Sequence, residues 1–263
     1  MARIRRLALL NAITFFIHLI MSWLIQFKAI NKKDVGEISD QYPSIFTPSG
    51  TTFLIWTVIY LALIAFSVFH LIKAFKEPET NEHNRDISNI SSFFIINNIA
   101  TASWLIFWVN NYIGTSEILI LIQLLTLIII HVRLNIHDSS RSFASKLFTQ
   151  FPLSIYLGWI SIATIANTSV WLTCMEWDRW GVSPINWTIT MIALAVFLTL
   201  IVINRKKNVF FGLVFIWALY GIITKRTADD AQDYEPIIMV SWIGIAIITL
   251  ACIFGFIRNL RRR

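Results

Sequence analysis

Long apolar runs alternate with short polar connections along the whole chain. Eight runs carry few charges, at residues 7–27, 52–73, 91–110, 113–134, 147–173, 185–204, 208–224 and 236–257. About 20 apolar residues at a rise of 1.5 Å each are enough to cross the hydrocarbon core of a bilayer. Membrane-spanning strands would instead alternate apolar and polar residues. The pattern therefore predicts an all-α polytopic membrane helix bundle with about eight transmembrane helices.

Composition supports this class and narrows the partners. The chain is 56% hydrophobic and 14% charged, whereas soluble domains carry about 25% charged residues. A net charge of +7 would suggest nucleic acid in a soluble protein, but the basic residues lie in connections between apolar runs. We therefore expect a lipid bilayer as partner and no nucleic acid. The apolar stretch within Met1–Ile25 follows three arginines as a signal peptide would, but no cleavage site follows it, so we expect a retained first helix.

The distribution of basic residues predicts the topology. With the N-terminus inside, 16 of the 22 Lys and Arg residues fall in inside segments and 6 in outside segments. Cytoplasmic loops carry the excess of Lys and Arg in membrane proteins. An even number of spans with both termini cytoplasmic fits this distribution.

Polar residues inside the spans indicate faces that pack against protein. The first span carries a stripe of Asn11, Thr14, His18 and Ser22 at helical spacing. His18 is either a haem ligand or proton carrier, or, as is more frequent, it bonds to a neighbouring helix. Glu117 lies about 8 Å inside the fourth span. It either snorkels and caps the helix start or belongs to a site.

Three connections differ in character. The outer segment 28–50 contains prolines and the apolar residues Tyr42, Ile45 and Phe46, so we expect it to lie over protein as a lid rather than form a solvated turn. The segment 75–89 is the most polar of the chain, and we expect a flexible, solvated connector. The outer segment 225–235 is rich in Asp and Glu. These carboxylates either bind a divalent cation or, as is more frequent in outer loops, are simply solvated.

One face of the fifth span combines large, small and polar residues. Pro152, Tyr156, Trp159, Ala163 and Asn167 follow one another at steps of 4, 3, 4 and 4. The face is either a helix–helix contact, in which Ala163 permits close approach and Asn167 bonds a neighbour, or a slot for a ligand.

The same span carries a family resemblance. The sequence Trp159-Ile160-Ser161-Ile162-Ala163-Thr164-Ile165-Ala166-Asn167 resembles the fifth-helix signature of the TspO/MBR family, the tryptophan-rich sensory proteins related to the peripheral benzodiazepine receptor, or translocator protein. A second match is Pro48 followed by Trp56-Thr57-x-x-Tyr60. The family's Gly-Pro pair is replaced by Leu54 and Ile55, and Thr101 stands where the family shows Asn three residues before Trp104. The resemblance covers residues 7–173, so we expect two domains, a five-helix core at 1–175 and a three-helix extension at 176–263.

Depth and resemblance together predict a binding site in the outer half of the bundle. Several segments place aromatic and polar groups at similar depth beneath the segment 28–50, and an aromatic concave site with few polar groups suits a small molecule. The predicted ligand-binding residues are Pro48, Phe53, Trp56, Tyr60, Thr101, Trp104, Glu117, Tyr156, Trp159, Ala163 and Asn167.

The resemblance implies an integral membrane receptor or sensor for a flat apolar ligand. The ligand would be a tetrapyrrole such as protoporphyrin, a haem-like group or a sterol-like molecule, and no cofactor is required. The membrane would be a bacterial inner membrane. The sequence leaves open whether the protein forms a homodimer. A small-molecule transporter or permease is one alternative and a tetrapyrrole-degrading enzyme a second. The sequence shows no catalytic constellation and no metal-ligand spacing.

Overall fold

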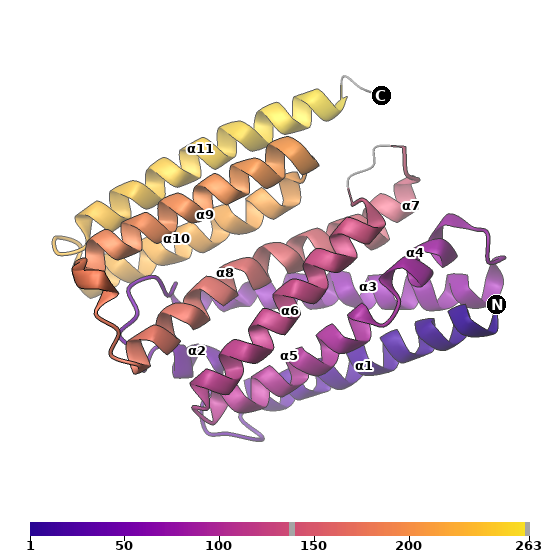
Figure 1. The fold of residues 1–263 in the computed structure, drawn as a ribbon, viewed down its shortest axis with the longest axis horizontal. Helices are drawn as coiled ribbons and strands as arrows, with labels where there is room; N and C mark the ends of the chain where they lie inside the picture. Colours follow the sequence, from indigo (N-terminus) through magenta and orange to yellow (C-terminus); the bar gives the residue numbers. More distant parts are fainter. Residues whose placement is uncertain (137–139, 261–263) are drawn as a thin grey trace. The chain divides into compact units, whose positions relative to one another are not determined.

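The apolar runs form helices with bounds close to those predicted (Figure 1). The structure is a computed structural model that describes residues 1–136 and 140–260, with the side chains of 258–260 left out. Arg261, Arg262 and Arg263, which the topology argument counts, lie outside the described residues. The long helices are α1 (Ala2–Gln26), α3 (Ile55–Lys76), α5 (Phe93–Val109), α6 (Ile113–Leu134), α8 (Phe151–Cys174), α9 (Pro184–Lys206), α10 (Val209–Asp230) and α11 (Glu235–Leu260). Short elements between them are α2 (Val35–Ser39), η1 (Gly50–Leu54), α4 (Glu82–Ile90), α7 (Phe143–Ser145), η2 (Lys146–Gln150) and η3 (Arg179–Gly181).

The lengths and composition of these helices confirm the membrane helix bundle. Seven helical segments in the described part of the chain are long and apolar enough to cross a bilayer. The predicted span at 91–110 is α5, whose 17 residues are bent by 55° against the preceding α4; counted as one broken span, the pair makes an eighth.

The chain forms two compact units. Unit 1 comprises Met1–Val35 and Ile55–Leu157, and unit 2 comprises Gly36–Leu54 and Gly158–Arg263. The segment 28–50 thus belongs partly to each unit. The predicted division near residue 175 rests on a family resemblance rather than on compactness, and it stays a prediction.

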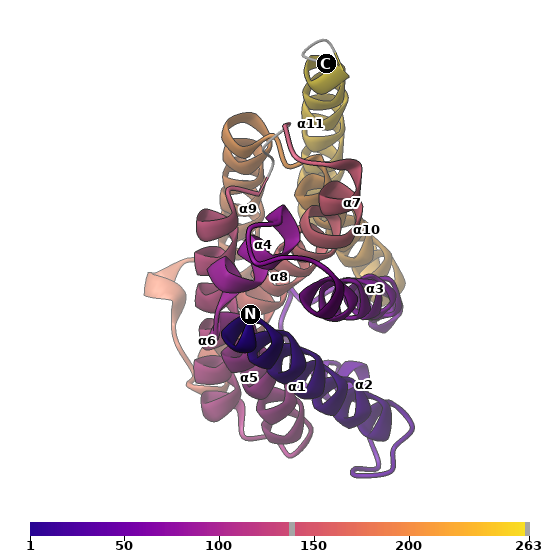
Figure 2. The same ribbon diagram turned by 90° about the vertical axis from the view of Figure 1, so that its right-hand side faces the viewer.

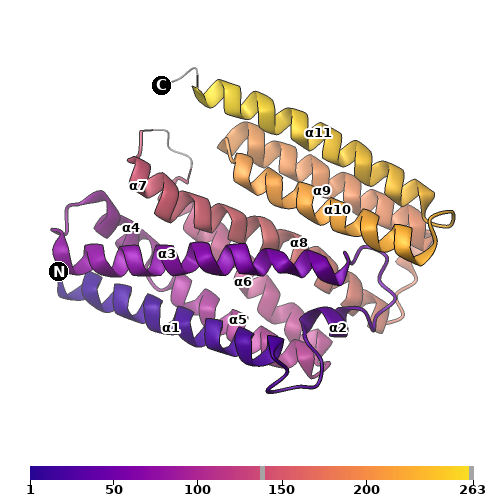
Figure 3. The ribbon, with the colours of Figure 1, turned by 180° about the vertical axis from the view of Figure 1, so that it is seen from behind.

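Unit 1 is built around α1, α3, α5 and α6. The helix α5 packs against both α1 and α6, and α1 also packs against α3 (Figure 3). Phe94 of α5 is fully buried between Phe15 and Phe66, with ring centroids 6.5 Å and 5.1 Å away. These aromatic contacts come from three helices and join them at one level.

The segment 75–89 is not the solvated connector that its composition predicted. It contains α4, which packs against α1, α3 and α6 at one end of unit 1 (Figure 2). His83, Asp86, Ile87 and Ile90 share one face at helical spacing and are all buried. Asn81 caps the helix start by accepting a hydrogen bond from the His83 amide at 2.9 Å. The prediction was wrong because the overall polar composition of the segment masks a short helix that has one buried face.

Unit 2 contains α9, α10 and α11, which lie side by side (Figure 1). Small residues permit close packing here: a Cβ at Gly212 would lie 2.6 Å from Ile203 Cδ1 and 2.7 Å from Cys252 Sγ. The α9–α10 connection is a tight turn. Lys207 takes a left-handed backbone with φ of 55°, and Asn208 caps α10 by accepting from the Phe211 amide at 3.0 Å.

The helix α10 runs six residues past the predicted end at residue 224, so the predicted loop 225–235 is shorter than expected. Arg226 is 4% exposed on this extension. Its guanidinium lies 3.0 Å from Asp229 and 5.0 Å from the centre of the Tyr234 ring. Asp229 and Asp230 thus belong to a helix end, where Asp229 pairs with Arg226.

Candidate ligand-binding site

A hydrogen-bonded polar group lies in the interior of unit 1. His18 is fully buried, with Nδ1 3.3 Å from Asn98 Oδ1 and Nε2 3.4 Å from the Tyr60 hydroxyl. That hydroxyl also donates to Ser22 Oγ at 2.8 Å. The polar stripe of the first span therefore packs against protein, as predicted. The interpretation of His18 as a residue bonded to a neighbouring helix is confirmed, because its ring nitrogens lie within hydrogen-bonding distance of side chains on α5 and α3.

Aromatic rings extend this polar group. Trp56 stacks on Tyr60 with ring centroids 5.1 Å apart and an interplanar angle of 20°. Tyr156 of α8 lies edge-on to Trp56 at 6.0 Å, and His18 lies edge-on at 6.4 Å. Trp56 is the partly buried member of the group, whereas Tyr60 and Tyr156 are buried.

The Thr101 side chain, which departs from the family pattern, has a definite partner. Its hydroxyl donates to the Asn97 carbonyl at 2.8 Å and lies 2.9 Å from the Tyr156 hydroxyl. Because its own proton is used, Thr101 accepts the proton of Tyr156. Asn97 in turn donates to Gln123 O at 3.0 Å and to Thr126 Oγ1 at 2.9 Å. Thr101, whose side chain is shorter than the asparagine of the family, thus links α5 to α8. Asn97 links α5 to α6.

Trp104 and Glu117 are two further predicted residues of unit 1. Trp104 stacks on Trp108 at 5.4 Å, and the Trp108 indole donates to the Val35 carbonyl at 3.1 Å. Glu117 is 5% exposed on α6, which disagrees with a carboxylate that snorkels to water. The other interpretation, that Glu117 belongs to a site, stays a prediction.

In unit 2, Trp159 is buried against Phe53. The two ring centroids are 5.6 Å apart and nearly perpendicular, and Trp159 is 2% exposed. One residue earlier on α8, a Cβ at Gly158 would lie 3.0 Å from Val214 Cβ, so α8 packs closely on α10 there. Asn167 and Pro48 are buried as well, and Ala163 is partly buried. The face of α8 in unit 2 therefore packs against protein, as predicted, whereas the close approach to α10 at Gly158 involves a different face of the helix.

The segment 28–50 is folded onto protein at both of its ends. In unit 1, the Asn31 side chain donates to Val109 O at 2.7 Å. In unit 2, Ser44 Oγ lies 2.9 Å from Ser169 Oγ, and Lys225 Nζ lies 2.6 Å from Asp40. Partial burial raises the pKa of the Tyr42 phenol. The solvated-turn alternative is wrong; whether the segment moves as a lid stays a prediction.

The structure brings two sets of the predicted residues together. Trp56, Tyr60, Thr101 and Tyr156 form one connected group in unit 1, and Phe53 contacts Trp159 in unit 2. Two cavities of the described chain are lined by none of the eleven predicted residues. No group of three or more His, Cys, Asp or Glu side chains could hold a metal ion within residues 1–136 and 140–260.

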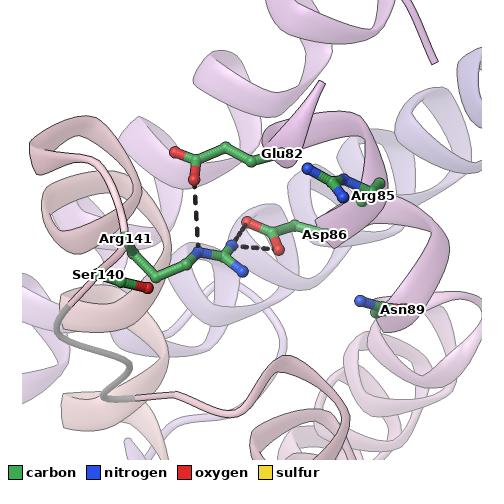
Figure 4. Close-up of a pocket in the computed structure, with 6 residues that line it drawn as sticks. All are labelled: Glu82, Arg85, Asp86, Asn89, Ser140 and Arg141. Carbon is green, nitrogen blue, oxygen red and sulfur yellow. Dashed lines mark hydrogen bonds and ion pairs between the residues drawn. The ribbon is translucent and has the colours of Figure 1, made fainter. Parts of the chain in front are cut away.

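Sequence reasoning missed a charged cavity of about 330 Å³ beside α4. Figure 4 shows the Arg141 guanidinium reaching toward Asp86 and Glu82, with Arg85 and Asn89 also on α4. Arg141 donates two hydrogen bonds to Asp86, whose side chain is fully buried. The helical spacing of the buried residues of α4 was the signal that could have found it.

One comparison with known proteins found a match. The family described as TSPO-like protein matches residues 8–254 of the chain. The expectation that the resemblance ends near residue 173 is corrected, because the match continues through α9 and α10 into α11. A comparison with curated proteins found no match, and neither did a comparison with solved structures.

Proposed function

The chain belongs to the family of TSPO-like proteins, and from this premise we propose that it is a membrane receptor or sensor that binds a flat apolar ligand. The chain is a multi-pass membrane protein of the TspO type. Ligand binding, the sensor role, a bacterial inner membrane and cytoplasmic termini are parts of the proposal. A homodimer is compatible with it.

One observation carries the proposal for unit 1. Trp56 offers a partly buried indole that is stacked on Tyr60 and flanked by the edge of Tyr156. Aromatic pairs contribute about 0.5–1.5 kcal/mol each beyond simple burial. The polar atoms behind these rings are bonded to one another, so a ligand meets π surfaces rather than unpaired polar groups. Such a surface suits a planar macrocycle or a sterol.

Two properties of the group describe how binding would proceed. Tyr156 is fully buried and Trp56 partly buried, so the ligand must displace part of the indole before it contacts the tyrosine. Trp159 and Ala163 follow Tyr156 on the same helix, one and two turns on. We propose, as the family resemblance implies, that Trp159 and Ala163 also take part in ligand binding.

A transporter is the second candidate, and the bent pair of α4 and α5 favours it. Their 55° bend joins a polar helix to an apolar one, and Asp86 on α4 is buried in an ion pair with Arg141. Interrupted helices and paired charges are frequent in transporters. An enzyme that degrades the bound tetrapyrrole is the third candidate. It would consume the porphyrin over time, whereas a receptor would only bind it until its sites are saturated.

The experiment is a titration of the purified protein in detergent with protoporphyrin, read by quenching of its tryptophans and by the porphyrin absorption band. We expect saturable binding at micromolar affinity, about 8 kcal/mol. Trp56→Ala should weaken binding about tenfold, because a stacking surface and buried area are lost. Trp23→Ala is the matched control, since Trp23 is 55% exposed on α1. Ala163→Phe should abolish binding by filling the slot.

The controls separate the candidates. Ile165→Phe introduces the same phenyl ring, with a smaller gain in volume, at about 200° around α8 from Ala163 and should leave binding intact. Equal binding by wild type, Trp56→Ala and Ala163→Phe would place the porphyrin outside the bundle and contradict the proposal. Flux of porphyrin into proteoliposomes would instead identify a transporter. Loss of the porphyrin band under light that Trp159→Phe abolishes would identify an enzyme.

A further inference from the structure

Unit 2 contains an apolar groove that the proposed function does not use. It has a volume of about 270 Å³ and is lined by Val209, Leu213, Ile216, Thr249, Cys252, Ile253, Phe256 and Ile257. The α10 residues lie on one face at steps of 4 and 3, and the α11 residues do so at steps of 3, 1, 3 and 1. The groove therefore runs along two helices for about 10 Å, from the rise per residue.

Contacts locate the groove at one end of these helices. Cys252 Sγ lies 3.8 Å from the carbonyl of Val209, the first residue of α10. A Cβ at Gly255 would lie 3.4 Å from Val209 Cγ2. The last turns of α11 thus pack on the first turn of α10, and the groove begins at Val209, directly after the α9–α10 connection.

That turn carries a basic cluster, Arg205, Lys206 and Lys207. Arg205 and Lys206 are exposed, and none of the three forms an ion pair within the part of the chain that the structure describes. No Asp or Glu occurs between Pro184 and Ala228 or after Glu235. The three helices therefore supply no counter-charge at this end.

The charge and the width of the groove help to decide between three possible occupants: a second copy of the chain, a transmembrane helix of another protein, and a lipid. A second copy of the chain docked symmetrically here would bring a second basic cluster to the first, and like charges repel. A transmembrane helix is about 10 Å wide, too wide for a groove of this volume and length. A single hydrocarbon chain is narrow enough, and an anionic head group attached to it would lie beside the basic cluster.

We propose that the α10/α11 groove binds one acyl chain of an anionic phospholipid, with its phosphate held by Arg205, Lys206 and Lys207. The groove accommodates the acyl chain, and the basic cluster selects lipids with an anionic head group. Hydrocarbon tails gain little from exchanging lipid for apolar side chains, so selectivity comes from the charges. The site is distinct from the aromatic group around Trp56 in unit 1.

Native mass spectrometry of the full-length protein in detergent tests the proposal. The protein is titrated with dioleoylphosphatidylglycerol, which is anionic, or dioleoylphosphatidylcholine, which has the same tails and no net charge. We expect the first phosphatidylglycerol to bind at least about tenfold more tightly, since each nearby cation contributes about fivefold. Leu213→Trp should lower this first occupancy by blocking the groove. Leu198→Trp on α9 is the matched control, because Leu198 is 48% exposed and Leu213 is 49% exposed.

A charge variant keeps the test decisive if Leu213→Trp does not fold. Arg205→Gln with Lys206→Gln should bring phosphatidylglycerol binding to within about fivefold of the phosphatidylcholine level, because Lys207 remains, and should leave phosphatidylcholine binding unchanged. Arg3→Gln with Arg6→Gln removes two exposed cations of α1 and should change neither. Equal binding of both lipids by wild type, or an equal loss in both tryptophan variants, overturns the proposal. Conversion of a dimer to a monomer by Leu213→Trp, without loss of lipid, assigns the groove to a second copy and also overturns it.

Discussion

Asp86 illustrates how one residue can depend on a distant partner. Its carboxylate is fully buried, and Arg141, 55 residues away in the sequence, donates to both of its oxygens. Arg141 Nε also lies 3.7 Å from Glu82. A buried charge is costly unless it is paired and hydrogen-bonded, so this carboxylate requires its arginine.

We predict that Arg141→Gln destabilises the protein by about 3–5 kcal/mol, because it leaves a buried carboxylate without its counter-ion. The measurement is the apparent melting temperature in detergent, together with the urea dependence of helicity. Lys225→Gln is the control: it also removes the cation of an Asp pair, but Asp40 is 51% exposed, so the cost should be about 0–1 kcal/mol. Equal melting temperatures for the two variants would contradict the assigned role of Arg141.

At the scale of elements, the segment 28–50 is bound to protein at several points and is not a free loop. We refer to residues 28–50 as the strap. Its first part is held to α5, where the Trp108 indole donates to Val35 O at 3.1 Å. Its last residues are held to α10, where the Ser49 amide donates to Gly221 O at 3.0 Å. Just beyond the segment, the Trp217 indole donates to Thr52 O at 2.9 Å. Between these points, Asp40 pairs with Lys225 at the protein surface.

We predict that the strap closes further when ligand binds. Cleavage by an endoproteinase specific for aspartate at Asp40 should slow when protoporphyrin is added, because closure over a ligand orders the segment. Lys225→Gln should raise the cleavage rate without ligand, since it releases the Asp40 contact. Tryptic cleavage at Arg205 serves as the internal control and should not change. A cleavage rate at Asp40 that stays constant up to saturating ligand would leave the segment as a fixed connector.

At the scale of the whole molecule, the basic residues predict the orientation of the helices in the membrane. Of the 22 Lys and Arg residues, 16 belong to segments on one predicted side. The turn between α9 and α10 contributes three of them within a single short connection. Short connections of this kind have the strongest influence on orientation.

We predict that reporters fused after Arg85, Lys146, Lys207 and the C-terminus lie in the cytoplasm, and that reporters after Val35, Arg179 and Asp230 lie outside. Paired alkaline phosphatase and green fluorescent protein fusions measure this. Replacing the three basic residues at 205–207 by Gln should weaken the orientation of the last helices and give mixed signals at Asp230. A C-terminus found outside would mean an odd number of spans.

The sequence by itself determined the class and nearly all of the long helices. The predicted span 113–134 and the helix Ile113–Leu134 have the same bounds, because crossing a bilayer requires one continuous apolar stretch, which is a local property. The inward placement of His18 and Asn167 was also predictable, since hydrocarbon disfavours polar side chains.

Only the tertiary structure decided which groups meet. The Thr101–Tyr156 hydrogen bond and the Asp86–Arg141 ion pair each join residues 55 positions apart, and no local pattern encodes such a partner. The helix α4 follows the same rule, because its buried Asp86 is paired with the distant Arg141. The extension of α10 to Asp230 differs, since Arg226 there contacts Asp229 and Tyr234, which are close in the sequence. Continuous apolar stretches thus determine where the chain crosses the membrane, whereas the contacts of Thr101 and Asp86 depend on partners that only the tertiary structure brings near.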